Sequence, residues 1–424
     1  MKLLLKNVGK IHTASIEING ITVIAGENDT GKSTIGRALF AVFNSFYHLP
    51  QQIRLERLRS IEILLNRIYF NEDTLTMSLG DPFEAAKEIV DHPEEYRGTP
   101  EEVQKSFEKL IERCMDEEVP DFPKEFVRET LLRIQEVLNI SDEAFVSKLL
   151  EKRLNAEFNN QVSNLFSEES GEIRLGIKDQ EFSVSIAENE VLQTENPESV
   201  SLHTEVVYMD DPFVLDEQGI RWRSRKVGYV DHREHLRAKL FHESSEGTLA
   251  DEILAEDKLK EIYKKLSSVC GGEIVHGKRL SGFGYRQKDS EKILNVKNLS
   301  TGLKTFVILK MLLLNGSIQR NGILVLDEPE IHLHPQWQLV FAELIVLIQK
   351  EFGIHVLMNT HSPYFLNAVE VYAEKYGISE KCNYYLAVSE KETSRIEDVT
   401  GCTEKIYKKL AKPLQELENE RGRL

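Results

Sequence analysis

The feature that most constrains this 424-residue chain is a short loop near its N-terminus, Gly26-Glu27-Asn28-Asp29-Thr30-Gly31-Lys32-Ser33-Thr34. Its two glycines are separated by four residues and followed directly by Lys and Ser, which is a phosphate-loop pattern. An apolar stretch over residues 21–25 leads into the loop, and apolar residues at helical spacing follow it. Strand, loop and helix in this order are the context that the pattern requires. The loop therefore predicts a nucleoside triphosphate site rather than an unliganded glycine-rich turn.

Each part of this loop has a chemical role in such a site. Glycines let successive backbone N–H groups and the N-terminus of the following helix face phosphate oxygens. Lys32 is expected to reach the β and γ phosphates, and the hydroxyl of Ser33 is expected to bind Mg²⁺.

Charge and cysteine content limit the partners of the chain. With 70 acidic against 53 basic side chains, the formal net charge is −17, which argues against general nucleic-acid binding and leaves only local DNA contact. The four cysteines form no C-x-x-C pair, as expected of a reduced cytoplasmic protein without a sulfur metal site. No stretch approaches the roughly 20 apolar residues of a membrane span, and residues 1–8 do not resemble a signal peptide. We expect no membrane contact.

The periodicity of apolar residues divides the chain into three parts. Residues 2–7, 12–18 and 22–26 alternate as short strands, and helical spacing replaces this alternation from about residue 50 to about residue 166. Within the helical part, Thr99-Pro100-Glu101-Glu102 has the cap, first-turn Pro and third-position Glu of a helix start. Strands resume with a predicted hairpin over residues 172–186. The predicted domains are residues 1–48, a helical insertion over residues 49–171, and residues 172–424.

A second motif is the apolar run Ile323-Leu324-Val325-Leu326, which ends in Asp327 and Glu328. Such a run is typical of a strand buried on both faces in a parallel sheet, and ligands bind at the carboxyl ends of these strands. Asp327 is expected to hold Mg²⁺, directly or through water. Glu328 is suited to polarise the attacking water as a general base.

Two further stretches are candidates for phosphate contact. Ser300 precedes a strongly apolar helix and offers a hydroxyl and free N–H groups at the helix start. An ordinary Ser cap would explain it in isolation, but its place just ahead of the acidic strand favours a second phosphate site. His361 follows another apolar strand, from which an imidazole can donate to a γ-phosphate oxygen.

Two other polar stretches have two interpretations each. Asp210-Asp211-Pro212 follows a strand and could reach Mg²⁺ or water, although turn chemistry is the commoner role of such residues. Arg221-Trp222-Arg223-Ser224-Arg225-Lys226 suits phosphate contact and base stacking. A solvated edge strand protected by charge is the favoured alternative for this basic segment.

Together these motifs resemble those of the ATP-binding-cassette (ABC) ATPases, especially the branch of SMC, RecF and OLD-family proteins. The resemblance covers roughly residues 1–48 and 202–390. It implies an α/β fold: an ABC-type P-loop ATPase head with an N-terminal antiparallel β subdomain and a helical insertion. It also implies ATP and Mg²⁺ as cofactors. The implied site residues are Gly26, Asn28, Gly31, Lys32, Ser33 and Thr34 in the Walker A loop, Ser300 and Gly302 in the signature motif, Asp327 and Glu328 in Walker B, and the switch histidine His361.

The sequence departs from the family pattern at two places. Thr301 and Leu303 replace a glycine and a polar residue of the usual signature motif, and no Gln can be assigned to the Q-loop, which should follow the strand ending near Asp210. The run from Glu328 to Pro335 resembles the D-loop region, so its two histidines are not interpreted as metal ligands.

The layout distinguishes among branches of this family. The insertion is too short and too broken for the long coiled coil of an SMC protein. The 63 residues after His361 contain no Asp-x-Asp of a Toprim nuclease. The remaining class is a stand-alone ATPase with a compact helical insertion. This layout is similar to that of the PtuA-type ATPases of Septu antiphage systems. This similarity implies a head-to-head dimer around ATP that serves as sensor and assembly platform for a separate nuclease or toxin. The alternatives are a RecF-like DNA repair ATPase and a slowly hydrolysing scaffold that controls a toxic partner.

Overall fold

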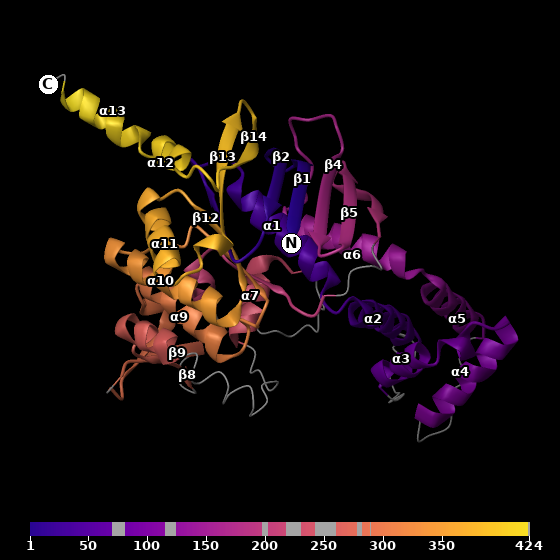
Figure 1. Cartoon of the computed structure of the whole chain (residues 1–424). Coiled ribbons are helices and arrows are strands. Elements are labelled where there is room, and N and C mark those ends of the chain that lie inside the picture. The colour runs from indigo at the N-terminus through magenta and orange to yellow at the C-terminus, as the bar shows by residue number, and fades with distance from the viewer. Residues whose placement is uncertain are drawn as a thin grey trace. The chain divides into compact units, whose positions relative to one another are not determined.

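The computed structural model describes residues 1–69, 81–114, 124–196, 202–217, 230–241, 260–277, 282–288 and 290–422. The chain divides into two compact units, coloured along the sequence in Figure 1. The first, called here the sheet unit, comprises Met1–Tyr47 and Leu149–Leu424. The second, the helical unit, comprises His48–Lys148.

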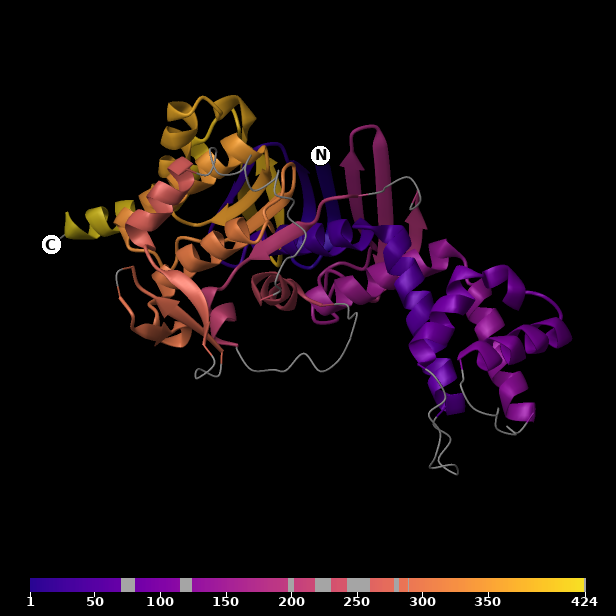
Figure 2. The same ribbon diagram turned by 90° about the horizontal axis from the view of Figure 1, so that it is seen from below.

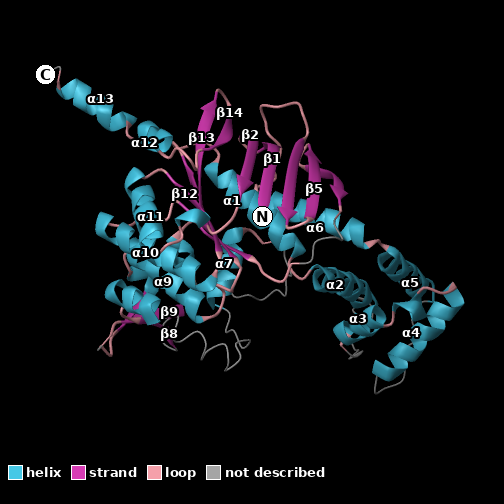
Figure 3. Cartoon of the chain, viewed as in Figure 1, coloured by secondary structure: helices cyan, strands magenta, loops and turns pink. Residues whose placement is uncertain are grey.

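One large mixed sheet forms the centre of the sheet unit (Figure 3). Within the described residues it has eleven strands, in the order β6 (Glu190–Glu195), β5 (Gln180–Ala187), β4 (Gly171–Ile177), β1 (Lys2–Val8), β2 (Ile11–Glu17), β14 (Thr393–Asp398), β13 (Cys382–Glu390), β3 (Ile21–Ala25), β12 (His355–Thr360), β11 (Ile323–Asp327) and β7 (Val206–Met209). The strands from β6 to β2 pair antiparallel, and those from β13 to β7 pair parallel. The sheet unit therefore has the predicted α/β architecture with an N-terminal antiparallel part.

The parallel strands are covered by helices on both faces. The helices of the sheet unit are α1 (Lys32–Phe46), α6 (Asp142–Glu157, which begins in the helical unit), α7 (His232–Phe241), α9 (Thr301–Leu314), α10 (Pro335–Phe352), α11 (Pro363–Lys375), α12 (Glu404–Leu410) and α13 (Lys412–Arg421). Leu324 and Leu326 of β11 pack into the large core with α9, α10 and α11, which lie together in Figure 1. The intervening Val325 points to the other face, toward Gly36 of α1. Burial on both faces explains why β11 is apolar at every position before Asp327.

Parallel pairing brings distant parts of the sequence to one edge of the sheet. The carboxyl ends of β3, β11, β12 and β7 lie side by side, with Ala25 paired to Thr360 and Asp327 paired to Asn359. The phosphate loop, the acidic strand and His361 therefore meet at this edge.

A smaller antiparallel sheet belongs to the same unit. Its strands within the described residues are β8 (Glu273–Gly277), β9 (Gly282–Arg286) and β10 (Ile293–Asn295). Residues 260–269 form a helix ahead of it, and the short 3-10 helices η3 (Pro212–Asp216), η4 (Val296–Asn298) and η5 (Ser379–Lys381) connect larger elements. At the other end of the unit, α13 has no buried residue and projects from the rest of the sheet unit in both views (Figures 1 and 2).

The helical unit has a core of its own. It contains α2 (Leu49–Tyr69), α3 (Pro82–Asp91), η1 (Pro93–Tyr96), α4 (Pro100–Cys114), α5 (Lys124–Asn139) and the first turns of α6. Tyr96, Phe107 and Ile134 are buried among its aliphatic side chains. The predicted helix start at Thr99 is confirmed, because its backbone N–H donates to Glu102 Oε2 at 2.8 Å and its hydroxyl faces the N–H of Glu102 at 3.4 Å.

Candidate active site

The phosphate loop joins β3 to α1 with two residues in the left-handed region. Asp29 has φ 61° and Gly31 has φ 75°. A Cβ added to Gly31 would lie 2.7 Å from Ile11 Cδ1, so both the backbone angle and the space favour glycine there. A Cβ at Gly26 would lie 2.9 Å from the Cβ of Ala387. The two glycines of the motif therefore allow the loop to pass close to neighbouring strands.

The ammonium of Lys32 lies inside this loop. Its side chain is 4% exposed, and Nζ donates to the carbonyl oxygens of Gly26 at 3.1 Å and Glu27 at 2.7 Å. A carboxylate oxygen of Glu328 lies 3.5 Å from the same nitrogen. The loop thus holds one buried cation at its centre, where a phosphate group would gain a charge-assisted hydrogen bond.

Two lysines from distant segments pair with the acidic side chains of the loop. Lys10 Nζ, in the turn between β1 and β2, lies 2.5 Å from Asp29 Oδ2. Lys409 Nζ, in α12, lies 3.0 Å from Glu27 Oε2. Among the other loop residues, Asn28 is exposed, whereas Ser33 and Thr34 are half-buried in the first turn of α1.

Asp327 is held at the end of β11 by two neutral donors. The hydroxyl of Tyr208 donates to Oδ2 at 2.8 Å, and the amide of Asn359 donates to Oδ1 at 2.9 Å. Burial, with Asp327 alongside, raises the pKa of Tyr208 well above its ordinary value, so Tyr208 remains a donor. Neither residue was predicted from the sequence. Asn359 had a detectable signal, since it ends the next parallel strand.

Glu328 adopts a left-handed backbone with φ 49°, which a non-glycine residue adopts at a cost of roughly 1–3 kcal/mol. Its N–H donates to the carbonyl of Asn359 at 3.0 Å. Its carboxylate lies 3.3 Å from His361 Nδ1 and is 25% exposed. This conformation brings Glu328, His361 and Lys32 together at a place that water can reach.

Glu330, two residues further on, is placed differently. Its side chain is 2% exposed, and Oε1 accepts from the Thr360 hydroxyl at 2.5 Å and from the His361 N–H at 3.3 Å. Burial raises the pKa of this carboxyl group, while the hydrogen bonds oppose the shift. Glu330 therefore anchors the chain at His361 rather than facing water.

The predicted signature residues lie at the start of α9. Ser300 occupies the N-cap position but its side chain makes no capping hydrogen bond. With Gly302, His332 and Trp337 it lines an open hollow of about 450 Å³. A Cβ at Gly302 would lie 2.8 Å from the His332 carbonyl oxygen, so this position requires glycine. Among the described residues, no hydrogen bond or ion pair joins Ser300 or Gly302 to the phosphate loop of the same chain.

Lys304, at the end of the signature stretch, does not line this hollow. It is buried, and its Nζ donates to Asp216 Oδ2 at 2.7 Å and lies 5.1 Å from the ring centroid of Phe213. This ion pair ties α9 to η3. In the same segment, Asp211 Oδ1 accepts from the Phe213 N–H at 2.8 Å, which confirms the turn interpretation of this acid.

Asp210 belongs to a buried cluster around His232. His232 Nδ1 lies 2.5 Å from Glu157 Oε1 and Nε2 lies 3.1 Å from Asp210 Oδ2, while Arg233 also pairs with Asp210 at 2.7 Å. Burial lowers the pKa of His232, but the bonds to Asp210 and Glu157 outweigh burial and raise that pKa to about 9. Burial likewise raises the pKa of Asp210, and its bonds to His232 and Arg233 bring it down to about 2. The strand-end acid is therefore occupied by protein partners.

This cluster predicts a loss of stability at alkaline pH. A histidine whose pKa rises from about 6.5 when unfolded to about 9 when folded stabilises the fold fully below pH 6.5, and this stabilisation disappears as pH rises through 9. We expect up to about 3 kcal/mol to be lost over this window, measured by urea unfolding at pH 6, 7.5 and 9. His232→Gln should abolish the dependence, whereas His92→Gln, at an exposed position, should retain it. Equal slopes in the wild type and His232→Gln would contradict this assignment.

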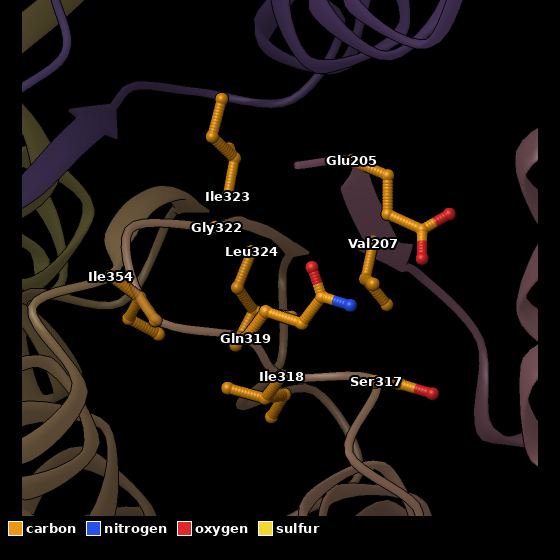
Figure 4. A pocket seen from close by; sticks show the side chains of 9 residues that line it. All are labelled: Glu205, Val207, Ser317, Ile318, Gln319, Gly322, Ile323, Leu324 and Ile354. Atoms are coloured by element: carbon orange, nitrogen blue, oxygen red, sulfur yellow. The ribbon is translucent and has the colours of Figure 1, made fainter. Parts of the chain in front are cut away.

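The described residues at the opposite edge of the sheet line a small cavity. Figure 4 shows a cavity there, at the amino ends of β7 and β11, lined by residues that include Glu205, Ser317, Ile323 and Ile354. Its volume is about 10 Å³, room for about one water molecule. This cavity is therefore too small for a nucleotide.

Three further observations limit the site. No group of three or more His, Cys, Asp or Glu side chains among the described residues could hold a metal ion by itself. None of the described helices combines the length and apolarity needed to cross a membrane. The basic segment from Arg221 to Lys226 lies outside the described residues.

Comparison with known proteins matches most of the chain to a family model. The model of a family described as AAA ATPase domain matches residues 1–366. The retron Vc95 probable ATPase of Vibrio cholerae serotype O1 biovar El Tor is 32% identical over 87 residues, and the retron Ec83 probable ATPase of Escherichia coli is 33% identical over 88 residues. Each of these alignments covers 18% of this chain and only 16% of the relative's length.

Solved structures of SMC heads also match along most of their length. The SMC head domain from Thermotoga maritima is 12% identical, covers 94% of this chain and 98% of its own, and gives a TM-score of 0.38. An SMC head bound to the C-terminal winged-helix domain of ScpA is 10% identical, with coverages of 94% and 97% and a TM-score of 0.44.

Proposed function

The chain belongs to the AAA ATPase domain family, and from this premise we propose that it binds Mg²⁺–ATP in its phosphate loop and hydrolyses it as one half of a head-to-head dimer. That it is an ATPase follows from its family. The assignment of the individual residues rests on one observation above all. Lys32, Glu328 and His361 follow three neighbouring parallel strands, β3, β11 and β12, and Glu328 lies 3.5 Å from Lys32 and 3.3 Å from His361 at the carboxyl edge of the sheet.

Asp327 and Ser33 are the proposed protein ligands of Mg²⁺. The ion prefers oxygen ligands and usually keeps several waters beside one or two carboxylates and substrate phosphates. Both oxygens of Asp327 already accept from uncharged donors, Tyr208 and Asn359, which fix the carboxylate without neutralising it. When bound, the ion supplies positive charge to the phosphate oxygens.

Glu328 is the proposed general base. Its carboxylate is partly exposed and forms no hydrogen bond with a neutral donor among the described contacts, so it can accept a proton from water. His361 Nδ1 lies next to it and is suited to donate to a γ-phosphate oxygen. Anchoring by Glu330 keeps the backbone of His361 in place. Hydrolysis by this arrangement needs the nucleotide between Lys32 and His361.

The signature residues are proposed to act on a second copy of the chain. The open hollow beside Ser300 and Gly302 lies at the start of a 14-residue helix, where free N–H groups and the helix dipole favour phosphate. Since no described contact joins these residues to the phosphate loop of their own chain, we assign the hollow to the triphosphate held by Lys32 of a second copy.

A complementation experiment tests this arrangement. Lys32→Ala and Ser300→Arg chains should each be inactive, because each lesion damages every composite site of its own homodimer. In a mixed dimer both lesions fall in one site and leave the other intact. Mixing the two inactive proteins should therefore restore part of the phosphate release, measured against each protein alone.

The control for this experiment shows whether the two variants form mixed dimers. Native mass spectrometry should show mixed dimers in the presence of ATP. If activity stays absent while mixed dimers form, either the signature residues act on the nucleotide of their own chain or both sites must hydrolyse ATP together.

We further propose that this cytoplasmic ATPase is the sensor and assembly platform for a separate nuclease or toxin in antiphage defence, in the manner of PtuA-type proteins. The two matched relatives are named as probable ATPases of retrons, which favours an ATPase that serves a larger system. A neighbouring nuclease gene and co-purification of its product would support this role. Salt-sensitive binding of the purified protein alone to gapped DNA would instead indicate repair. Tight ATP binding with negligible phosphate release would indicate a scaffold.

A further inference from the structure

The phosphate loop carries two acidic side chains, although its proposed ligand is an anion. Lys32 is opposed by Glu27 and Asp29, so the nine residues from Gly26 to Thr34 carry a net charge of −1 by themselves. A carboxylate a few ångströms from a triphosphate repels it, and the repulsion is strongest where water is partly excluded. The two carboxylates therefore weaken the attraction that the backbone N–H groups and Lys32 exert on an anion.

In the folded chain, two lysines from distant parts of the sequence form ion pairs with these carboxylates. Lys10 pairs with Asp29, and Lys409 pairs with Glu27 at 3.0 Å. Together they change the local net charge from −1 to +1. Lys409 is of particular interest because α12 lies beyond residue 366, where the match to the AAA ATPase domain family ends.

The position of Lys409 is fixed by the packing of α12. Ile406 is fully buried in the main core, and the Tyr407 hydroxyl donates to Glu370 of α11. Lys408, the preceding residue, is exposed and forms no ion pair among the described residues. Of these two neighbouring lysines on one helix, Lys409 pairs with the phosphate loop and Lys408 does not.

We propose that Lys409 is part of the nucleotide site and acts through Glu27: by neutralising this carboxylate it raises the affinity of the phosphate loop for the triphosphate. The proposal rests on nucleotide binding in that loop. Lys409 is a positioning and charge-balancing residue, because it contacts the loop rather than the reacting atoms. Since both side chains of the pair are partly exposed, its effect is moderated by solvent and should decline with ionic strength.

A double-mutant cycle on the full chain tests the proposal. ATP affinity is measured by calorimetry at low salt for the wild type, Lys409→Gln, Glu27→Gln and Glu27→Gln/Lys409→Gln. We expect Lys409→Gln to weaken binding about 3- to 10-fold, and the double variant to bind about as well as the wild type because no uncompensated carboxylate remains. Lys408→Gln removes the same charge from the same helix and should bind normally. The loss in Lys409→Gln should shrink when salt is raised to about 0.5 M.

Several outcomes would overturn this inference. If Lys409→Gln weakened binding equally in the wild type and in the Glu27→Gln variant, Lys409 would not act through Glu27. Unchanged affinity in Lys409→Gln, with thermal unfolding also unchanged, would show that the pair has no influence. Lys32→Ala, measured in the same series, separates this inference from the proposed function. Normal ATP binding by Lys32→Ala would overturn both the inference and the proposed function. Weakened ATP binding by Lys32→Ala together with normal binding by Lys409→Gln would overturn only the role of Lys409.

Discussion

Glu328→Gln is expected to hydrolyse ATP about 10² to 10⁴ times more slowly than the wild type, which is the usual contribution of a positioned general base. The carboxamide has nearly the same shape as the carboxylate but cannot take a proton from water. Because the substituted group lies beside His361 and Lys32 rather than replacing them, ATP affinity should persist and the nucleotide-bound state should accumulate. Phosphate release in single turnovers and calorimetric ATP affinity measure the two effects separately.

Glu330→Gln is the matched control for this prediction. Glu330 is also acidic and close to His361, but it is buried and bonded to Thr360. Its amide can still accept from Thr360, so the loss of turnover should be much smaller than in Glu328→Gln. Wild-type turnover in Glu328→Gln together with a large loss in Glu330→Gln would move the general base to Glu330.

Lys32→Ala is expected to weaken ATP binding by about 30-fold or more. Removal of one partner of a buried charge pair typically costs roughly 2–5 kcal/mol, and each 1.4 kcal/mol is a factor of ten in affinity. Lys32 is the only buried cation in the described phosphate loop, so no neighbour replaces its charge at the β and γ phosphates. Calorimetry with ATP in the presence of Mg²⁺ measures the loss.

Folding must be checked in this variant, because Lys32 also donates to the carbonyl oxygens of Gly26 and Glu27. Lys32→Met keeps most of the side-chain volume, and both variants should retain the circular dichroism of the wild type. Normal ATP affinity in two folded variants would rule out the phosphate loop as the nucleotide site.

In the signature stretch, the local sequence pattern predicts the helix start but not the tertiary contacts. The sequence places Ser300 at a helix start and predicts a phosphate site there, and the structure confirms the helix start. The role of Lys304 could not be inferred from the same stretch. Its burial against Asp216 and Phe213 depends on how α9 packs on η3, about 90 residues away in the sequence.

Asp210 shows the same limit for a strand end. From the sequence, an acidic pair after a strand is compatible with Mg²⁺ binding or with a turn. In the structure, Asp211 accepts a hydrogen bond from the Phe213 N–H in a local turn, which the neighbouring Pro212 made predictable. Asp210 instead pairs with His232 and Arg233, and these residues reach it only because α7 packs on β7.

The sequence by itself determined the parts whose physics is local. The glycines and Lys32 predict a phosphate loop, the apolar run before Asp327 predicts a buried strand, and helical spacing from about residue 50 predicts helices there, because each pattern depends on residues that are close in the sequence. Tertiary structure decided which distant side chains complete the site. Tyr208 bonds to Asp327 across 119 positions, and Lys409 reaches Glu27 from the other end of the chain. Strand order, register and helix packing determine such contacts, and these depend on the whole core rather than on any one segment.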